Sequence, residues 1–234
     1  LQGNGSTGSF IRNAVFGYIE DTFIRDLAIT GERWFGGIAL RANVGFERCA
    51  VASNKVLTDG GGIFVAQGQC LLSNCVVTAN QSIVNGGGLF VVTNATLRVD
   101  ASSILANSTV SPGPGNGAGV YGSAASVLLV TNNSLIAGNA TPNDGGGAYL
   151  EADTSAAVAA SEVSRNSANY GAGIYELGSL IMTDSRMLSN SASLHVGALH
   201  LGASATGTVA RTIIAFNSAA STVGGIHCQG SAWI

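Results

Sequence analysis

Apolar and polar residues alternate in short stretches along the chain, and turn-forming residues bound each stretch. Residues 96–100, Thr-Leu-Arg-Val-Asp, and residues 179–183, Ser-Leu-Ile-Met-Thr, illustrate the pattern. A period of two is typical of strands, because neighbouring side chains of a strand point to opposite faces. The pattern therefore predicts many short strands separated by turns.

Two motifs recur in register with these stretches. The first is a pair of small residues followed by an aliphatic residue, and the second is an apolar residue followed three positions later by an asparagine. The third residues of the first motif are Ile38, Ile63, Leu89, Val120, Ala148, Ile174, Leu199 and Ile226, spaced by 25, 26, 31, 28, 26, 25 and 27 residues. The asparagines of the second motif are Asn54, Asn80, Asn107, Asn139, Asn166, Asn190 and Asn217. The repeat unit is thus about 25–27 residues long.

A unit of this length cannot bury its own apolar face, so it must stack on its neighbours. We therefore expect an all-β fold, a right-handed parallel β-helix of about eight coils that occupies residues 36–234. Residues 1–35, which lack the motifs, are expected to form a degenerate first coil or an N-terminal cap. The motif aliphatics should fill the interior, and the asparagines should form a structural ladder at one turn. The chain begins without a leader and stops within a repeat, so we expect a fragment of a longer protein.

The paired motifs, such as Gly87-Gly88-Leu89 and Val77-x-x-Asn80, resemble the GGA(I/L/V) and FxxN repeats of the chlamydial polymorphic outer-membrane proteins. Val, Ile or Met stands here where that family has Phe. The resemblance covers roughly residues 36–230. It implies an autotransported surface β-helix with a role in adhesion.

Charged residues make up only 10% of the chain, against roughly 25% in an ordinary soluble domain, and the net charge is −3. This balance argues against nucleic-acid binding, and no apolar run approaches the roughly 18 residues of a membrane span. Lateral faces with so little charge are expected to pack against neighbours or to be shielded by glycans.

The residue after each motif aliphatic is aromatic or histidine in seven consecutive units. These residues are Phe64, Phe90, Tyr121, Tyr149, Tyr175, His200 and His227. Strand alternation predicts that they lie outside the helix, opposite the buried aliphatics. Such a stripe could stabilise the sheet by ring packing, the interpretation that we favour, or could bind sugars or another chain. No third ligand is evident beside His200 and His227, so no metal site is expected there.

A polar stripe stands four residues before the aliphatics, at Asp59, Asn85, Asn116 and Asp144. Its oxygens could hold Ca²⁺, with Asp59 and Asp144 as the weak candidates. The plainer interpretation is that Asp-Gly and Asn-Gly pairs form turns. We expect no cofactor and no metal.

Cys49 and Cys75 both precede a ladder asparagine by five residues, so they should stack on adjacent coils. That spacing predicts a Cys49–Cys75 disulfide, with two buried thiols as the alternative. No partner for Cys70 or Cys228 is evident in the sequence.

Six N-x-S/T sequons occur. Asn94, Asn132 and Asn4 are the expected glycosylation sites, whereas Asn80, Asn107 and Asn139 belong to the ladder and should be buried and unmodified.

Polysaccharide-cleaving β-helices need carboxylates clustered on one face, and the carboxylates of this chain do not stack. We therefore expect no catalysis. The sequence favours a structural or adhesive rod, extracellular or on a cell surface, in a surface protein or filament. Its expected partners are other copies or segments of a surface assembly, through the helix ends or lateral faces, and possible glycan ligands. The alternative is a β-helix that binds or cleaves carbohydrate through the aromatic stripe.

Overall fold

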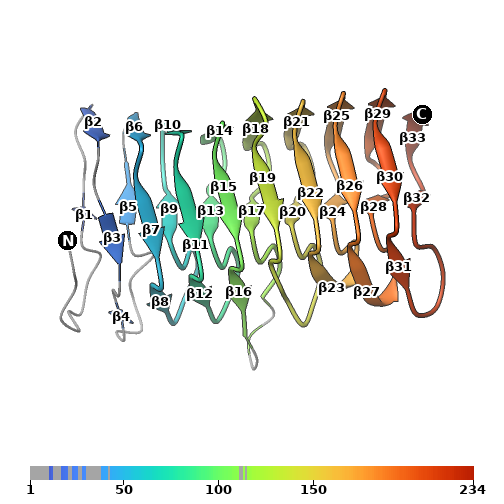
Figure 1. Ribbon diagram of the computed structural model, residues 1–234, viewed down its shortest axis with the longest axis horizontal. Helices are drawn as coiled ribbons and strands as arrows, with labels where there is room; N and C mark the ends of the chain where they lie inside the picture. The colour runs from blue at the N-terminus through green and yellow to red at the C-terminus, as the bar shows by residue number, and fades with distance from the viewer. Residues whose placement is uncertain are drawn as a thin grey trace.

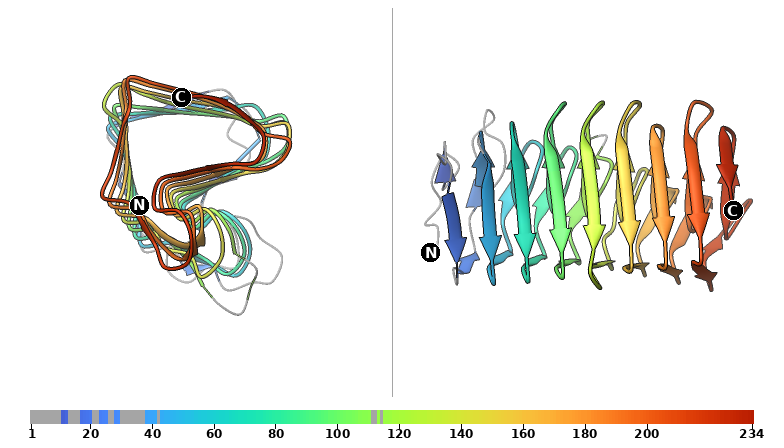
Figure 2. Two further views of the ribbon diagram at one scale, coloured as in Figure 1. Left: turned by 90° about the vertical axis from the view of Figure 1, so that its right-hand side faces the viewer. Right: turned by 90° about the horizontal axis from the view of Figure 1, so that it is seen from above.

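The computed structural model describes residues 11–12, 17–20, 23–25, 28–29, 38–41, 43–110, 113 and 115–234. The described residues form strands and turns with no helix, so none could cross a membrane as a helix. The chain winds as a right-handed parallel β-helix, with each coil stacked on the one before it (Figures 1 and 2). The predicted fold class is confirmed.

Three long sheets run along the helix axis, and every strand pair in them is parallel. Sheet 1 contains β1 (Ile11–Arg12), β5 (Ile38–Leu40), β9 (Ile63–Val65), β13 (Leu89–Val91), β17 (Val120–Gly122), β20 (Ala148–Leu150), β24 (Ile174–Glu176), β28 (Leu199–Leu201) and β32 (Ile226–Cys228). Sheet 2 contains β2 (Gly17–Glu20), β6 (Val44–Glu47), β10 (Gln69–Ser73), β14 (Thr96–Asp100), β18 (Val127–Thr131), β21 (Ser155–Ala159), β25 (Ser179–Thr183), β29 (Thr206–Ala210) and β33 (Ser231–Trp233). Sheet 3 contains β3 (Phe23–Arg25), β7 (Ala50–Ala52), β11 (Val76–Thr78), β15 (Ser103–Leu105), β19 (Leu135–Ala137), β22 (Glu162–Ser164), β26 (Arg186–Leu188) and β30 (Ile213–Ala215).

A fourth side of the coil carries two shorter sheets, which we call sheet 4 together. The first contains β4 (Ala28–Ile29), β8 (Lys55–Val56), β12 (Gln81–Ser82) and β16 (Ser108–Thr109). The second contains β23 (Ser167–Tyr170), β27 (Ser191–His195) and β31 (Ser218–Ala219). Within residues 1–35, strands β1–β4 pair in parallel with β5–β8.

The motif aliphatics set the register of sheet 1. Ile38 pairs with Ile63, Ile63 with Leu89, and the same register continues to Ile226. The strands predicted over 96–100 and 179–183 are β14 and β25. The repeat spacing therefore translates directly into strand pairing.

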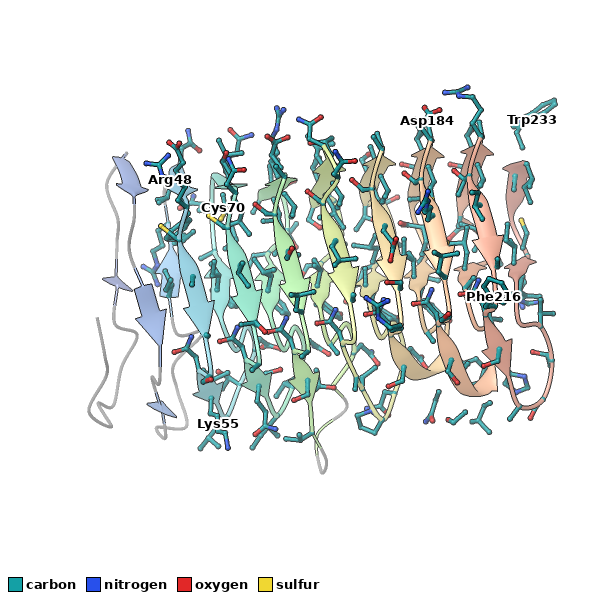
Figure 3. All side chains as sticks on the ribbon, viewed as in Figure 1. Arg48, Lys55, Cys70, Asp184, Phe216 and Trp233 are labelled. Atoms are coloured by element: carbon teal, nitrogen blue, oxygen red, sulfur yellow. The ribbon has the colours of Figure 1, made fainter. Side chains whose placement is uncertain are left out.

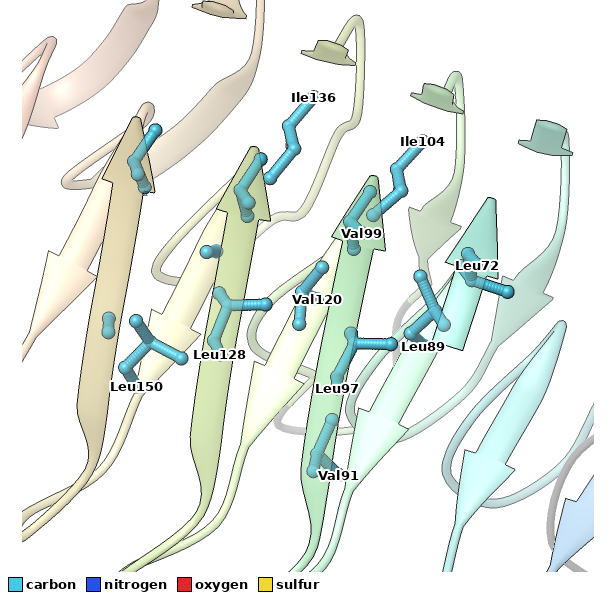
Figure 4. Close-up of a cluster of buried hydrophobic side chains, with 14 of the residues drawn as sticks. Leu72, Leu89, Val91, Leu97, Val99, Ile104, Val120, Leu128, Ile136 and Leu150 are labelled. Atoms are coloured by element: carbon cyan, nitrogen blue, oxygen red, sulfur yellow. The ribbon is translucent and has the colours of Figure 1, made fainter. Parts of the chain in front are cut away.

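Sheets 1, 2 and 3 enclose one continuous apolar core. Figure 4 shows side chains of neighbouring coils, such as Leu97 and Leu128, stacked in rows inside it. These side chains alternate with outward ones along each strand, as the burial of Leu97 and Val99 around exposed Arg98 illustrates. Rows of aliphatic side chains in van der Waals contact stabilise the stack by burial.

The seven motif asparagines form a ladder at the turn between sheets 3 and 4. The Nδ2 of Asn80 donates to Oδ1 of Asn107 at 3.0 Å and to the carbonyl of Val51 at 2.9 Å. The backbone N–H of Asn80 donates to the same Oδ1 at 3.0 Å. The same pattern recurs at each following coil as far as Asn190 and Asn217. Each asparagine thereby satisfies backbone groups that a turn would otherwise leave unpaired.

The small residues of the first motif pack against this ladder. A Cβ on Gly88 would lie 2.7 Å from the carbonyl oxygen of Gly119 and 2.9 Å from the side chain of Asn107. Real Cβ atoms do not approach other atoms so closely, so this position requires glycine. The two motifs recur together because each fits against the other.

A second ladder, which we call the hydroxyl–thiol ladder, lies five residues before the asparagines. Its positions are Cys49, Cys75, Ser102, Ser134, Ser161, Ser185 and Thr212. The backbone N–H of Cys49 donates to Sγ of Cys75 at 3.4 Å, and that of Cys75 donates to Oγ of Ser102 at 2.8 Å. The Cys75 thiol donates in turn to the carbonyl of Phe46 at 3.3 Å.

This ladder corrects the cysteine prediction. All four cysteines lie in the described part of the chain, and no disulfide joins any of them. Cys49 and Cys75 do stack on adjacent coils, but their sulfurs take the places that serine hydroxyls occupy in later coils. Cys70 is buried in the core, where desolvation raises its pKa, and Cys228 is exposed.

Candidate functional site

The seven aromatic and histidine side chains of the predicted stripe form a continuous stack on the face of sheet 1 that points away from the core. We call it the ring ladder. Its centroid separations, from Phe64 to His227, are 5.1, 5.0, 5.3, 4.9, 4.4 and 5.2 Å. The first four ring pairs are stacked within 14° of parallel. The strand register alone produces this arrangement, because consecutive coils place the same position in contact.

The prediction that this stripe lies exposed is wrong for most of its members. Phe64, Phe90 and Tyr121 are 7, 9 and 6% exposed, and they form an apolar cluster with Ala66, Val92 and Tyr149. His200 is 6% exposed. The cause is the path of the coil, which doubles back beneath sheet 1 after sheet 4 and covers this face (Figure 2, left). Alternation fixes the face to which a side chain points, but not what covers that face.

The polar stripe lies in this covering segment. The backbone N–H of Asn85 donates to Oδ1 of Asp59 at 2.9 Å, and that of Asp144 donates to Oδ1 of Asn116 at 3.1 Å. Desolvation raises the pKa of both Asp59 and Asp144. The side-chain oxygens of Asp59, Asn85 and Asn116 thus join neighbouring coils. The described residues hold no group of three His, Cys, Asp or Glu side chains that could bind a metal.

The same position changes character in the C-terminal coils. Four residues before the aliphatics, the polar stripe continues as Tyr170, His195 and Thr222. The rings of Tyr170 and His195 lie 4.7 Å apart, and Nδ1 of His195 lies 3.1 Å from Oγ1 of Thr222. These three residues were not predicted as part of a site, although their place four residues before Ile174, Leu199 and Ile226 is a signal that the sequence contains.

The two stripes line one cavity, which we call the aromatic cleft. It has a volume of about 520 Å³. Its lining residues are Tyr170, Tyr175, His195, Val196, His200, Thr222, Val223, His227 and Gln229. A cavity with aromatic side chains and a few polar groups is the usual form of a small-molecule site. This cleft is therefore the candidate functional site.

Two histidines of the cleft are paired. Nδ1 of His200 lies 3.1 Å from Nδ1 of His227. Desolvation, together with the smaller effect of the neighbouring His227, lowers the pKa of His200 to about 4. His200 is therefore neutral at physiological pH.

The phenols of the ring ladder are also kept neutral. Desolvation raises the pKa of Tyr149 to about 12, and it raises that of Tyr121, whose hydroxyl bonds to the Glu151 carboxylate. The other Glu151 oxygen accepts the backbone N–H of Ala124 at 2.8 Å. Tyr121 is thus fixed in place as a structural residue.

A buried carboxyl group occurs inside the core at Glu176, a residue that the sequence analysis did not single out. Glu176 is in register with Leu150 and Leu201 and is fully buried. Its Oε1 accepts hydrogen bonds from Thr154 at 2.7 Å and from the N–H of Gly178 at 2.8 Å. Its Oε2 has no partner, and desolvation raises the pKa of the group to about 8. The sequence signal for this group is the charge of Glu176 at a position where the neighbouring coils have the aliphatic residues Leu150 and Leu201.

The predicted glycosylation sites differ in accessibility. Asn94 lies in an exposed turn with a φ of 64°. Asn132 is exposed too, but its Nδ2 donates to Oδ1 of Asp100 at 2.6 Å. Asn4 lies outside the described residues, and the ladder asparagines Asn80 and Asn107 are buried.

The described site is thus a cleft with two ring-bearing walls, built from positions that the repeat places in register. No protein-family model, curated protein or solved structure matches this chain.

Proposed function

We propose that the protein is a non-catalytic structural or adhesive rod that acts outside the cell or on its surface. The observation that carries this proposal is a rod of continuous parallel sheets that exposes large apolar side chains. Phe216 is 86% exposed and Trp233 82% exposed (Figure 3). Exposed apolar side chains of this size favour packing against a partner surface.

The lateral faces support assembly as well. A hollow of about 440 Å³ lies on the outer face of sheet 2, lined in part by Leu129, Ile181 and Trp233. Ile181 is 55% exposed. With a charged fraction of only 10%, such faces favour packing against other copies or other segments of a surface assembly.

The adhesive role and the surface location rest on the motif resemblance to the chlamydial polymorphic outer-membrane proteins. Membership of that family is part of this proposal. Glycans on Asn94, if the source glycosylates its exported proteins, would shield part of the weakly charged surface.

Electron microscopy and sedimentation of the purified chain test the rod proposal. We expect elongated assemblies longer than one chain, which the double variant Phe216→Ser, Trp233→Ser shortens or abolishes. Arg98→Ser, at an exposed polar position of β14, is the matched control and should leave assembly intact. A monodisperse monomer at high concentration, for wild type and variants alike, would contradict the proposal.

Carbohydrate binding in the aromatic cleft is the second candidate. The specific observation is that Tyr170, 36% exposed, and the half-buried Tyr175 both line the cleft, where a sugar could stack on their rings. The residues that line the cleft include no Asp or Glu, which favours binding over cleavage.

A glycan array followed by calorimetry tests this candidate. Tyr170→Ser should abolish glycan binding without loss of melting temperature. Tyr175→Ser should abolish it too, with some loss of melting temperature because it removes a stacked ring. Ile181→Ser, on the outer face of sheet 2, is the matched control and should bind glycan as the wild type does. Equal binding by all four proteins would exclude the cleft.

A further inference from the structure

We propose that His200 and His227 form a binding site for a divalent transition-metal ion of the Zn²⁺, Ni²⁺ or Cu²⁺ type, open to the aromatic cleft. The two residues lie on β28 and β32, which pair in parallel, and they are direct partners in the register. Their position is therefore fixed by the backbone of sheet 1 and not by a flexible loop. The site goes beyond the proposed rod function and does not depend on it.

The separation of the two nitrogens fits a shared metal ion. Nδ1 of His200 and Nδ1 of His227 are 3.1 Å apart. With metal–nitrogen bonds of about 2.0–2.1 Å, two imidazole nitrogens on one ion lie about 2.9 Å apart at a right angle and about 3.4 Å apart at a tetrahedral angle. The observed separation falls between these limits, so the spacing of the two nitrogens fits one ion. The rings lie stacked at 23° to each other, so binding must turn them until both in-plane lone pairs point at the ion.

The chemistry of the pair also suits such an ion. Imidazole nitrogen is a preferred ligand of zinc, nickel and copper, and it binds them only when neutral. In the empty pair, one Nδ1 must carry the hydrogen that bonds to the other. Metal binding moves that proton to Nε2 of the same ring and leaves both Nδ1 lone pairs for the ion.

The cleft supplies the remaining coordination positions. Its volume of about 520 Å³ leaves room for water or an added ligand beside the pair. His195 lines the same cleft, but its Nδ1 contacts Oγ1 of Thr222, and the described residues contain no cluster of three potential metal ligands. The site therefore has two protein ligands and open positions, the arrangement in which an ion can still accept another molecule. From the sequence we expected no metal because no third protein ligand was evident beside the two histidines. An open site does not need a third protein ligand.

Titration of the untagged chain with ZnCl₂, followed by calorimetry, tests the proposal, and Cu²⁺ electron paramagnetic resonance counts the coordinating nitrogens. We expect one ion for each chain and coupling to two nitrogens. His200→Phe and His227→Gln should each weaken the affinity for Zn²⁺ by at least about tenfold. Loss of a residue that only supports a metal ligand already costs about this much, so loss of a ligand should cost no less. His195→Gln, in the same cleft, is the matched control and should leave the affinity unchanged.

The melting temperature of each variant separates loss of the site from loss of the fold. His200→Phe should fold, because Phe64 and Phe90 occupy the same register position in earlier coils. Equal zinc affinity in wild type, His200→Phe and His227→Gln would overturn the proposal, as would a folded wild type that binds no ion. A loss of affinity in His195→Gln equal to that in His227→Gln would also overturn the two-histidine assignment.

Discussion

The backbone N–H of Cys49 donates to the sulfur of Cys75 at a distance of 3.4 Å, across two adjacent coils. In the next coil, the N–H of Cys75 donates to the hydroxyl of Ser102 at 2.8 Å. Sulfur and hydroxyl thus perform the same task at successive positions of one ladder. The two cysteines are hydrogen-bonding residues of a turn and not the halves of a cross-link.

Cys75→Ser should therefore be tolerated. Serine supplies the acceptor that later coils already use, so we expect the free energy of unfolding to change by about 1 kcal/mol or less. Cys75→Ala should cost about 1–3 kcal/mol, because it removes the acceptor for the buried N–H of Cys49. Chemical denaturation checks both variants. A large loss of stability on adding a reducing agent to the wild type would instead support the disulfide.

Asn107→Ala should be among the most destabilising single substitutions. Oδ1 of Asn107 accepts both the backbone N–H and the Nδ2 of Asn80, and its own Nδ2 donates to Val77 and Asn139. Leaving several buried groups unpaired should cost about 3 kcal/mol or more. Asn217→Ala is the control at the partly exposed end of the ladder, where water can replace the lost bonds. If chemical denaturation shows that the two variants lose equal free energy of unfolding, burial of the Asn107 side chain is not the reason for its effect.

Phe90→Ala tests the buried state of the ring ladder. The side chain is 9% exposed between Phe64 and Tyr121, so its removal should cost about 3–5 kcal/mol, as for a core residue. Ile181→Ala, at a 55% exposed position on sheet 2, should change stability by about 0.5 kcal/mol or less. A similar small effect at both positions, in thermal or chemical unfolding, would show that the stripe is accessible to solvent.

Glu176 should make stability depend on pH. Its pKa rises from 4.5 to about 8 on folding, so the folded state retains a proton that the unfolded chain releases. The stabilising effect is complete below pH 4.5 and is lost as the pH rises to about 8, by up to about 1.4 kcal/mol for each pH unit.

Glu176→Gln removes this titration and keeps an oxygen for Thr154 and Gly178. The difference in free energy of unfolding between wild type and variant, measured from pH 4.5 to pH 8, should move in favour of the variant as the pH rises. A difference that stays constant over this range would mean that the Glu176 carboxyl is not held protonated.

The sequence by itself determined the architecture, the register and the asparagine ladder. In a parallel stack, residues one repeat apart lie side by side. The spacing of Ile63, Leu89 and Val120 along the sequence therefore determines which residues pair. The ring ladder was predictable for the same reason, as was the stacking of Cys49 on Cys75.

Only the tertiary structure decided what covers each face and which partner each group finds. Alternation assigned Phe90 to the far face of sheet 1, but the segment that doubles back beneath it made that face a second apolar cluster. The ends of β23 and β27 in sheet 4 bring Tyr170 and His195 into one cleft with Tyr175 and His200. Contacts between coils follow from the repeat, whereas contacts within a coil depend on the path of its turns, which no periodicity encodes.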